Sequence, residues 1–190
     1  IVKRKIEFFG WHSSQFIKNT LNDYINGKLI IINMSNSNYK TEIDNLSDLS
    51  NYIGKEVGLS EWFKVTQDDI NTFAKLTHDE QWIHIDIEKS KKYSPYKTTV
   101  AHGFYILSLG TKFVYETFNV KNVKMGVNYG LDRVRFMSPT LSGGYVRGRV
   151  ALMNAEYSPG TAKYKMSITF EFKGQDKPVC VAEFLAMAYE

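Results

Sequence analysis

One apolar helix followed by four strand-like runs constrains the fold of this 190-residue chain more than any other feature. Between Gly103 and Phe118 the apolar residues spread over most sides of a helix, and such a helix is usually buried. The chain after it is divided by Ser-Pro, Gly-Gly, Pro-Gly and Gly-Gln-Asp turn signals into four runs of strand composition, 126–136, 145–154, 163–172 and 179–189. We therefore predict an α+β fold in which an antiparallel β-sheet wraps around one long central helix.

Composition narrows the class of protein. Hydrophobic residues make up 43% of the chain and charged residues 23%, which is enough apolar material for a core and excludes a disordered chain. The net charge of +4 is too small to predict binding to nucleic acid. No apolar run approaches the roughly 20 residues of a membrane-spanning helix, so we expect a soluble protein with no membrane partner.

The single cysteine, Cys180, excludes an intrachain disulfide and any multi-cysteine zinc site. It stands between two valines, so we expect a small core residue rather than a nucleophile. A chain without disulfides favours a reducing compartment, and we expect the cytoplasm. The first ten residues lack the long apolar core of a signal peptide.

The chain divides into two regions that differ in amino-acid composition. Residues 1–44 are rich in Asn, Ser and Lys, and we predict an appendage of unknown role that holds a helix near 16–25 and a short strand at 28–33. Residues 45–190 carry the sharper signals and form one predicted domain. No internal repeat is found.

A cluster of titratable side chains follows a predicted short helix. Thr66 and Asp69 form a helix-start pattern, and this helix delivers the chain to T-H-D-E-Q-W-I-H-I-D, which contains Asp79 and His84. An Asp and a His that share one water can polarise it and move its proton. The alternative is that Asp79 caps a turn and His84 is a packed imidazole. For Asp86 we expect a structural role at the start of the next helix.

A second feature lies at the start of the apolar helix, where Ala101-His102-Gly103 precede it. Glycine lets a ligand approach the backbone, and the unpaired N–H groups of a helix's first turn can stabilise a developing oxyanion. The alternative is that Gly103 is required only for packing.

Three separated motifs carry a family resemblance. They are F-A-K-L-T-H-D-E-Q-W-I-H-I-D (73–86), V-A-H-G-F-Y-I-L-S-L (100–109) and N-Y-G-L-D-R-V-R-F-M-S-P (128–139). In this order they resemble the MaoC-like hydratase and dehydratase family, and within it the nodulation protein N group. The resemblance covers roughly residues 44–190. It implies a hot-dog fold, R-specific hydration of trans-2-enoyl thioesters with dehydration as the reverse, and no cofactor beyond the coenzyme A or acyl carrier protein that carries the substrate.

The resemblance also assigns roles by position. Asp79 and His84 match the family's catalytic pair, and Gly103 matches the glycine whose N–H binds the thioester carbonyl. Gln81 and Trp82, which we expect to contact substrate, stand where many members have Asn and Pro. His78 stands where Gly is common, and His rarely adopts the positive φ that Gly tolerates.

Further substrate-binding candidates come from spacing. Ser108 and Thr111 face a similar direction on the apolar helix and are candidates to line the substrate pocket, although such hydroxyls often bond to their own helix. Arg133 and Arg135 share one side of a strand, where they would either clamp a coenzyme A phosphate or form a solvated face. His102 with Asp79 and His84 has the composition of a metal site, but the family needs none and we predict none.

The charge is concentrated in one stretch. Residues 91–150 hold 10 basic and 2 acidic residues, which include the Lys91, Lys92 and Lys97 approach to Gly103. A phosphate-bearing carrier would dock there. The resemblance implies an acyl-CoA or acyl carrier protein thioester as substrate. It also implies a homodimer whose sheets join edge to edge, which would cover an otherwise exposed sheet edge. A hot-dog thioesterase and a non-catalytic acyl-thioester binding module are the competing functions.

Overall fold

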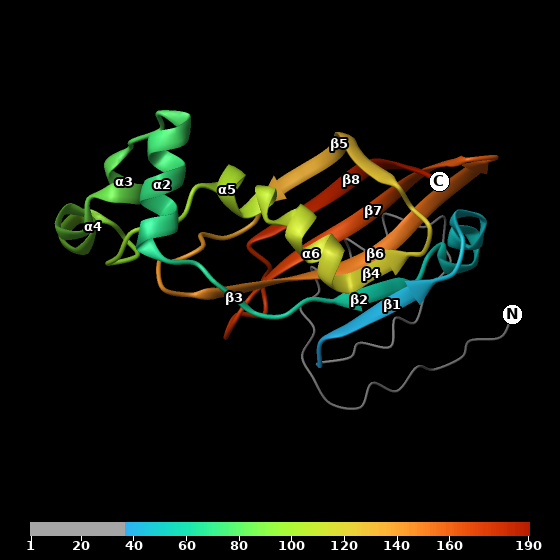
Figure 1. Ribbon diagram of the computed structural model, residues 1–190. Helices are drawn as coiled ribbons and strands as arrows, with labels where there is room; N and C mark the ends of the chain where they lie inside the picture. The colour runs from blue at the N-terminus through green and yellow to red at the C-terminus, as the bar shows by residue number, and fades with distance from the viewer. Residues whose placement is uncertain (1–36) are drawn as a thin grey trace, which may run out of the picture. The chain divides into compact units, whose positions relative to one another are not determined.

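The computed structural model describes residues 37–190, which all lie in one compact unit (Figure 1). The helix and strand predicted near 16–25 and 28–33 lie outside the described residues. Eight strands form the sheet: β1 (Tyr39–Ile43), β2 (Glu56–Leu59), β3 (Phe63–Lys64), β4 (Phe118–Val120), β5 (Met125–Phe136), β6 (Tyr145–Ser158), β7 (Thr161–Phe172) and β8 (Cys180–Tyr189). The four strand runs predicted after the apolar helix are confirmed as β5 to β8.

The order of the strands is β4-β1-β2-β6-β7-β8-β5, and β3 pairs with β6. The long strands pair antiparallel, as predicted, whereas β1 and β4 pair parallel. Because β1 pairs with β2 and β4, residues 39–43 belong to the sheet and not to the segment before it. Their alternation of half-buried and exposed side chains is typical of such an edge region.

Within residues 37–190, six helical segments connect the strands: the 3-10 helix η1 (Leu46–Tyr52) and the α-helices α2 (Gln67–Thr77), α3 (Trp82–Ile85), α4 (Ile87–Tyr93), α5 (Gly103–Ser108) and α6 (Gly110–Thr117). The predicted single central helix is therefore two consecutive segments. At their junction the Leu109 N–H donates to Ile106 O at 3.2 Å, a tighter three-residue step than that of an α-helix. No helix within residues 37–190 is long and apolar enough to cross a membrane.

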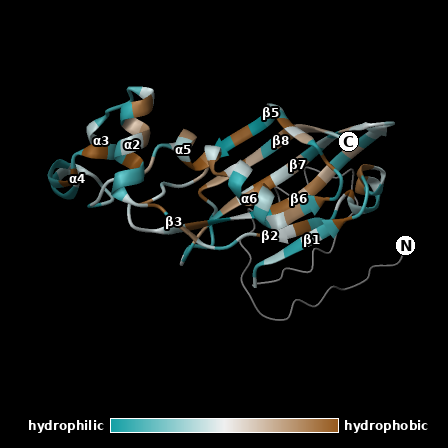
Figure 2. Cartoon of the chain, viewed as in Figure 1, coloured by the Kyte–Doolittle hydropathy of each residue, from teal (hydrophilic) through white to brown (hydrophobic). Residues whose placement is uncertain are grey.

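The core lies between α6 and the inner face of the sheet. Apolar and polar residues alternate along β7, so that one face of this strand is apolar, and β8 is apolar at most positions (Figure 2). Phe113 of α6 meets Phe170 of β7 with ring centroids 5.8 Å apart. The expectation of a helix buried on nearly all sides is wrong for the single chain, because Phe104 and Tyr115 are each 70% exposed.

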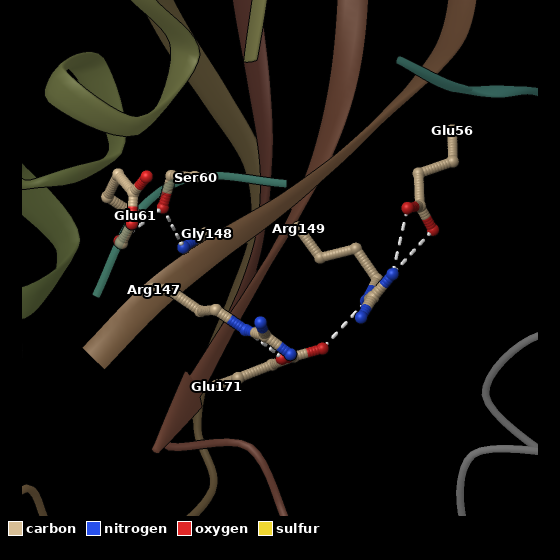
Figure 3. Close-up of polar contacts among 7 residues, drawn as sticks. All are labelled: Glu56, Ser60, Glu61, Arg147, Gly148, Arg149 and Glu171. Carbon is tan, nitrogen blue, oxygen red and sulfur yellow. Dashed lines mark hydrogen bonds and ion pairs between the residues drawn. The ribbon is translucent and has the colours of Figure 1, made fainter. Parts of the chain in front are cut away.

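The outer face of the sheet carries an ion-pair network across β2, β6 and β7 (Figure 3). Glu171 of β7 accepts from Arg147 Nε and Arg149 Nε of β6, each at 2.7 Å. Arg149 Nη1 also donates to both carboxylate oxygens of Glu56 in β2, at 2.8 and 2.9 Å. The Arg147 guanidinium lies 4.4 Å from the centre of the Trp62 ring. The network ties three neighbouring strands together, and it uses two of the basic residues counted in 91–150.

Candidate active site

The chain enters the site through α2. Its first turn is a capping box, in which the Asp69 N–H donates to Thr66 Oγ1 and the Thr66 N–H donates to Asp69 Oδ2, each at 3.2 Å. This confirms the predicted helix start. The helix ends at His78, which adopts the left-handed conformation with φ 59° and ψ 21°. The chain thus makes here, with a histidine, the turn for which glycine is better suited, at a cost of about 1 kcal/mol.

His84 is a buried imidazole on α3, with 8% of its surface exposed. Its Nδ1 lies 2.6 Å from the Val100 carbonyl oxygen. Because a carbonyl can only accept, Nδ1 carries the hydrogen and Nε2 keeps a lone pair. Burial lowers the pKa of His84 below its usual 6.5, and the neighbouring His102 lowers it further, against the Val100 hydrogen bond and the Asp79 charge. His84 is thus a neutral base at pH 7.

His102 and Asp79 complete the cluster. The His102 ring stacks on the His84 ring with centroids 3.7 Å apart and planes 25° apart. Its Nε2 lies 2.9 Å from the Asp79 carbonyl oxygen and 3.9 Å from Asp79 Oδ2. The Asp79 side chain is 58% exposed, so an accessible carboxylate stands in front of two buried rings. The structure therefore brings the two predicted catalytic residues together.

One polar atom from each of Asp79, His84 and His102 lies within 4.8 Å of the others, a spacing that suits a metal ion. The arrangement does not fit one. His102 Nε2 faces a carbonyl oxygen and so carries a hydrogen, which leaves that nitrogen no lone pair for a metal. The lone pair of this ring is on Nδ1, which is buried.

Gln67, which no sequence motif predicts as a site residue, joins the elements of the site from α2. Its Nε2 donates to the His84 carbonyl oxygen at 2.7 Å, and its Oε1 accepts from the Thr99 hydroxyl. The Val100 N–H donates to Ile83 O at 3.0 Å. These bonds join α2, α3 and the segment before α5. Only the folded chain brings these segments together, so a single sequence contains no periodicity or motif that marks Gln67.

Gly103 is the first residue of α5 and directly follows the stacked His102. At this position its N–H has no intrahelical acceptor. A Cβ added to Gly103 would lie 2.9 Å from the Phe136 ring of β5. Glycine is therefore required for packing, and the same position offers a free helix-start N–H one residue after His102, whose ring stacks on His84.

The structure places the other predicted contact residues less centrally. Gln81 is exposed, and Trp82 is half-buried with Lys89 Nζ 5.2 Å from its ring centre. The exposed Ser108 donates to Tyr105 O of its own helix at 2.6 Å. Thr111 Oγ1 accepts from Asn128 Nδ2 at 2.9 Å. Substrate contact by these four predicted residues stays a prediction.

The two strand arginines lie exposed on β5. Arg133 Nε is 3.8 Å from Glu183 Oε1, and Arg135 Nη1 donates to its neighbour Val134 O at 2.8 Å. Two structural roles are confirmed. Asp86 caps α4 by accepting from the Lys89 N–H at 2.8 Å. Cys180 is fully buried, and burial raises the pKa of its thiol to about 12, so it is not a thiolate nucleophile.

Comparison with solved structures identifies the class of fold. The unliganded R-hydratase PhaJ1 from Pseudomonas aeruginosa superimposes with a TM-score of 0.57 at 19% identity, over 68% of this chain and 78% of that one. The fold is thus that of the hot-dog hydratases and dehydratases, with its antiparallel sheet packed on α5 and α6.

Sequence comparison identifies the family. Residues 48–169 match the model described as the MaoC like domain. The chain is 41% identical to 3-hydroxyacyl-thioester dehydratase Z from Mycobacterium tuberculosis over 141 residues, 74% of this chain and 93% of that protein. It is 38% identical to nodulation protein N from Rhizobium leguminosarum over 75% of this chain and 89% of that protein. The chain belongs to the MaoC-like dehydratase family and is an enzyme of the hydro-lyase class.

Proposed function

We propose that the protein is an R-specific enoyl-thioester hydratase and 3-hydroxyacyl-thioester dehydratase that uses Asp79 and His84 as its acid and base. One observation carries the proposal. A buried His84, kept neutral and with its Nε2 lone pair unprotonated, lies beside the exposed Asp79 carboxylate. Such a pair suits proton transfer near pH 7.

The proposed reaction uses three groups of the chain. The Gly103 N–H polarises the thioester carbonyl, which makes the β-carbon electrophilic. Asp79 and His84 hold a water above that carbon. One of them accepts a proton as the C–O bond forms, and a proton is delivered to the α-carbon as the double bond is lost. Asp79 and His84 act on the same water as one acid–base pair.

The proposed substrate carries its acyl group on coenzyme A or on an acyl carrier protein, with no further cofactor. Both carriers bring phosphate groups. Lys91 and Lys92 are exposed in the last turn of α4, whose N-cap follows His84 by two residues, and Lys97 is exposed shortly after this helix. Arg133 and Arg135 are exposed on β5, so each group offers cations to a phosphate.

We further propose a homodimer formed through β5. This 12-residue strand lies at one end of the sheet, and its side chains are mostly exposed in the single chain. The exposed apolar residues include Met125, Val127, Tyr129, Leu131 and Phe136. Proteins rarely leave a long apolar edge strand unpaired. The lone buried cysteine agrees with a reducing compartment such as the cytoplasm.

A panel of trans-2-enoyl-CoA thioesters of increasing chain length tests the function. We expect loss of the conjugated thioester absorbance and formation of the (3R)-hydroxyacyl product. Release of free thiol would instead identify a thioesterase. Binding of the thioesters without any turnover would identify a binding module. Either result would overturn the proposal.

A further inference from the structure

His102 is a buried histidine that the proposed chemistry does not use. Only 3% of it is exposed, and its Nε2 is engaged by the Asp79 carbonyl oxygen. It nevertheless contacts both proposed catalytic residues, through ring stacking on His84 and through Nε2 to the Asp79 backbone. We propose that His102 is a positioning residue that holds the Asp79 backbone against the His84 ring, a role that rests on the proposed function of that pair.

The direction of the hydrogen bond defines what His102 must be. The Asp79 carbonyl oxygen can only accept, so His102 Nε2 carries the hydrogen and Nδ1 is a bare acceptor. That Nδ1 is buried and has no hydrogen-bond partner within residues 37–190. A buried polar atom without a partner costs stability, so packing alone would favour an apolar ring at this position. The N–H donated to Asp79 is the property that an apolar ring lacks.

The ring is held firmly enough to position its neighbour. Phe73 of α2 lies on it with ring centroids 5.1 Å apart, and His84 lies 3.7 Å away. Phe73 is in turn 5.6 Å from the Tyr105 ring of α5. His102 also precedes Gly103 in the chain. The position of His102 Nε2 is therefore fixed by α2, α3 and α5 together, and Asp79, in the exposed turn after α2, is tied to that fixed point.

Two substitutions separate the hydrogen bond from the ring. His102→Phe keeps a stacked ring but loses the donor, whereas His102→Gln loses the ring but keeps an amide N–H that reaches a similar position. We expect His102→Phe to lower kcat about tenfold or more, since small misplacements of reacting groups are costly, with KM changed less than about threefold. Its melting temperature should equal or exceed that of the wild type. His102→Gln should keep kcat within about threefold of the wild type.

Nuclear magnetic resonance supplies a readout that does not need activity, and with four histidines in the chain each ring can be assigned. The ¹⁵N shifts should show a hydrogen on Nε2 of His102 and on Nδ1 of His84. The Asp79 amide signal should move more in His102→Phe than in His102→Gln.

Three results would overturn the proposal: wild-type kcat in His102→Phe, a kcat that falls only together with the melting temperature in both variants, or a hydrogen on His102 Nδ1. A wild type that hydrates no enoyl thioester would instead count against the proposed function, and the resonance data would still decide the role of His102.

Discussion

The chemistry of the site depends on which nitrogen of His84 carries a hydrogen. The Val100 carbonyl assigns it to Nδ1, and burial keeps the ring neutral. Asp79 has the opposite environment, since it is exposed in a turn. Two groups with different surroundings can therefore divide the tasks of holding and moving one proton.

The pH dependence of the reaction follows from His84. Its pKa is lowered, so the catalytic form persists below the ordinary histidine value of 6.5, and kcat/KM should begin to fall only on the acid side of that value. The control is His78→Asn, which replaces an exposed histidine by a residue that tolerates a positive φ. This variant should keep the same fall of kcat/KM at acid pH. An acid limb centred well above pH 6.5 would contradict the account.

The site residues that could be predicted from the sequence are those that belong to short motifs. Asp79, His84 and Gly103 lie in two motifs, and the structure places His84 and Asp79 together. Gln67 and the contacts of His102 could not be predicted, because these arise where α2, α3 and the start of α5 meet in space. A histidine at position 78 predicts a changed loop backbone, because histidine rarely adopts a positive φ, but the structure keeps the left-handed turn there.

At the scale of elements, the helix α2 supports the site from its first turn. Thr66 caps the helix, and the next residue, Gln67, holds the His84 carbonyl. The helices α5 and α6 show a limit of prediction from the hydropathy pattern. The apolar stretch 103–118 predicted one helix, yet the Leu109 to Ile106 hydrogen bond divides it. Hydropathy predicts that a segment is buried, but it does not predict where the backbone hydrogen bonds change from four-residue to three-residue spacing.

Loss of the cap should weaken α2. Thr66→Ala removes the hydroxyl that accepts from the Asp69 N–H and should lower the free energy of unfolding by about 1 kcal/mol. Thr66→Ser keeps the hydroxyl and serves as the control, with a change of less than about 0.5 kcal/mol. Urea unfolding of both variants measures the difference. Equal stabilities of the two would show that the capping box contributes nothing.

The ion-pair network on the outer face of the sheet should contribute more to the free energy of unfolding than an exposed ion pair does. Glu171→Ala leaves Arg147 and Arg149 without a shared carboxylate and should lower the free energy of unfolding by about 2 kcal/mol, a value reduced for the partial exposure of Glu171. Asp44→Ala breaks the exposed pair with Lys121 and should cause no measurable change. Chemical denaturation compares them, and equal effects would refute a special role for the network.

At the scale of the whole molecule, the single chain leaves apolar surface at one end of its sheet. β5 and Phe104 are exposed there, and Phe104 meets Phe136 edge to face at 5.7 Å. The sequence predicted the strand β5 as part of an antiparallel sheet, but it did not predict that β5 would lie at the end of that sheet. Strand order depends on pairing between distant segments, which hydropathy along the chain does not encode.

Light scattering tests the dimer. The wild type should have about twice the chain mass of 21.9 kDa. Leu131→Arg places a charge on the exposed edge and should yield a monomer. Tyr157→Lys changes an equally exposed apolar residue of β6 and should stay dimeric. A monomeric wild type would contradict the proposed assembly.

The central claim is that Asp79 and His84 act as one acid–base pair on an enoyl thioester. The most direct measurement is the rate of enoyl-CoA hydration in Asp79→Asn and His84→Gln, followed by loss of the conjugated thioester absorbance, with folding checked by circular dichroism. We predict that each folded variant loses about 10² to 10⁴ in kcat. Near wild-type turnover in a folded Asp79→Asn variant would contradict the account.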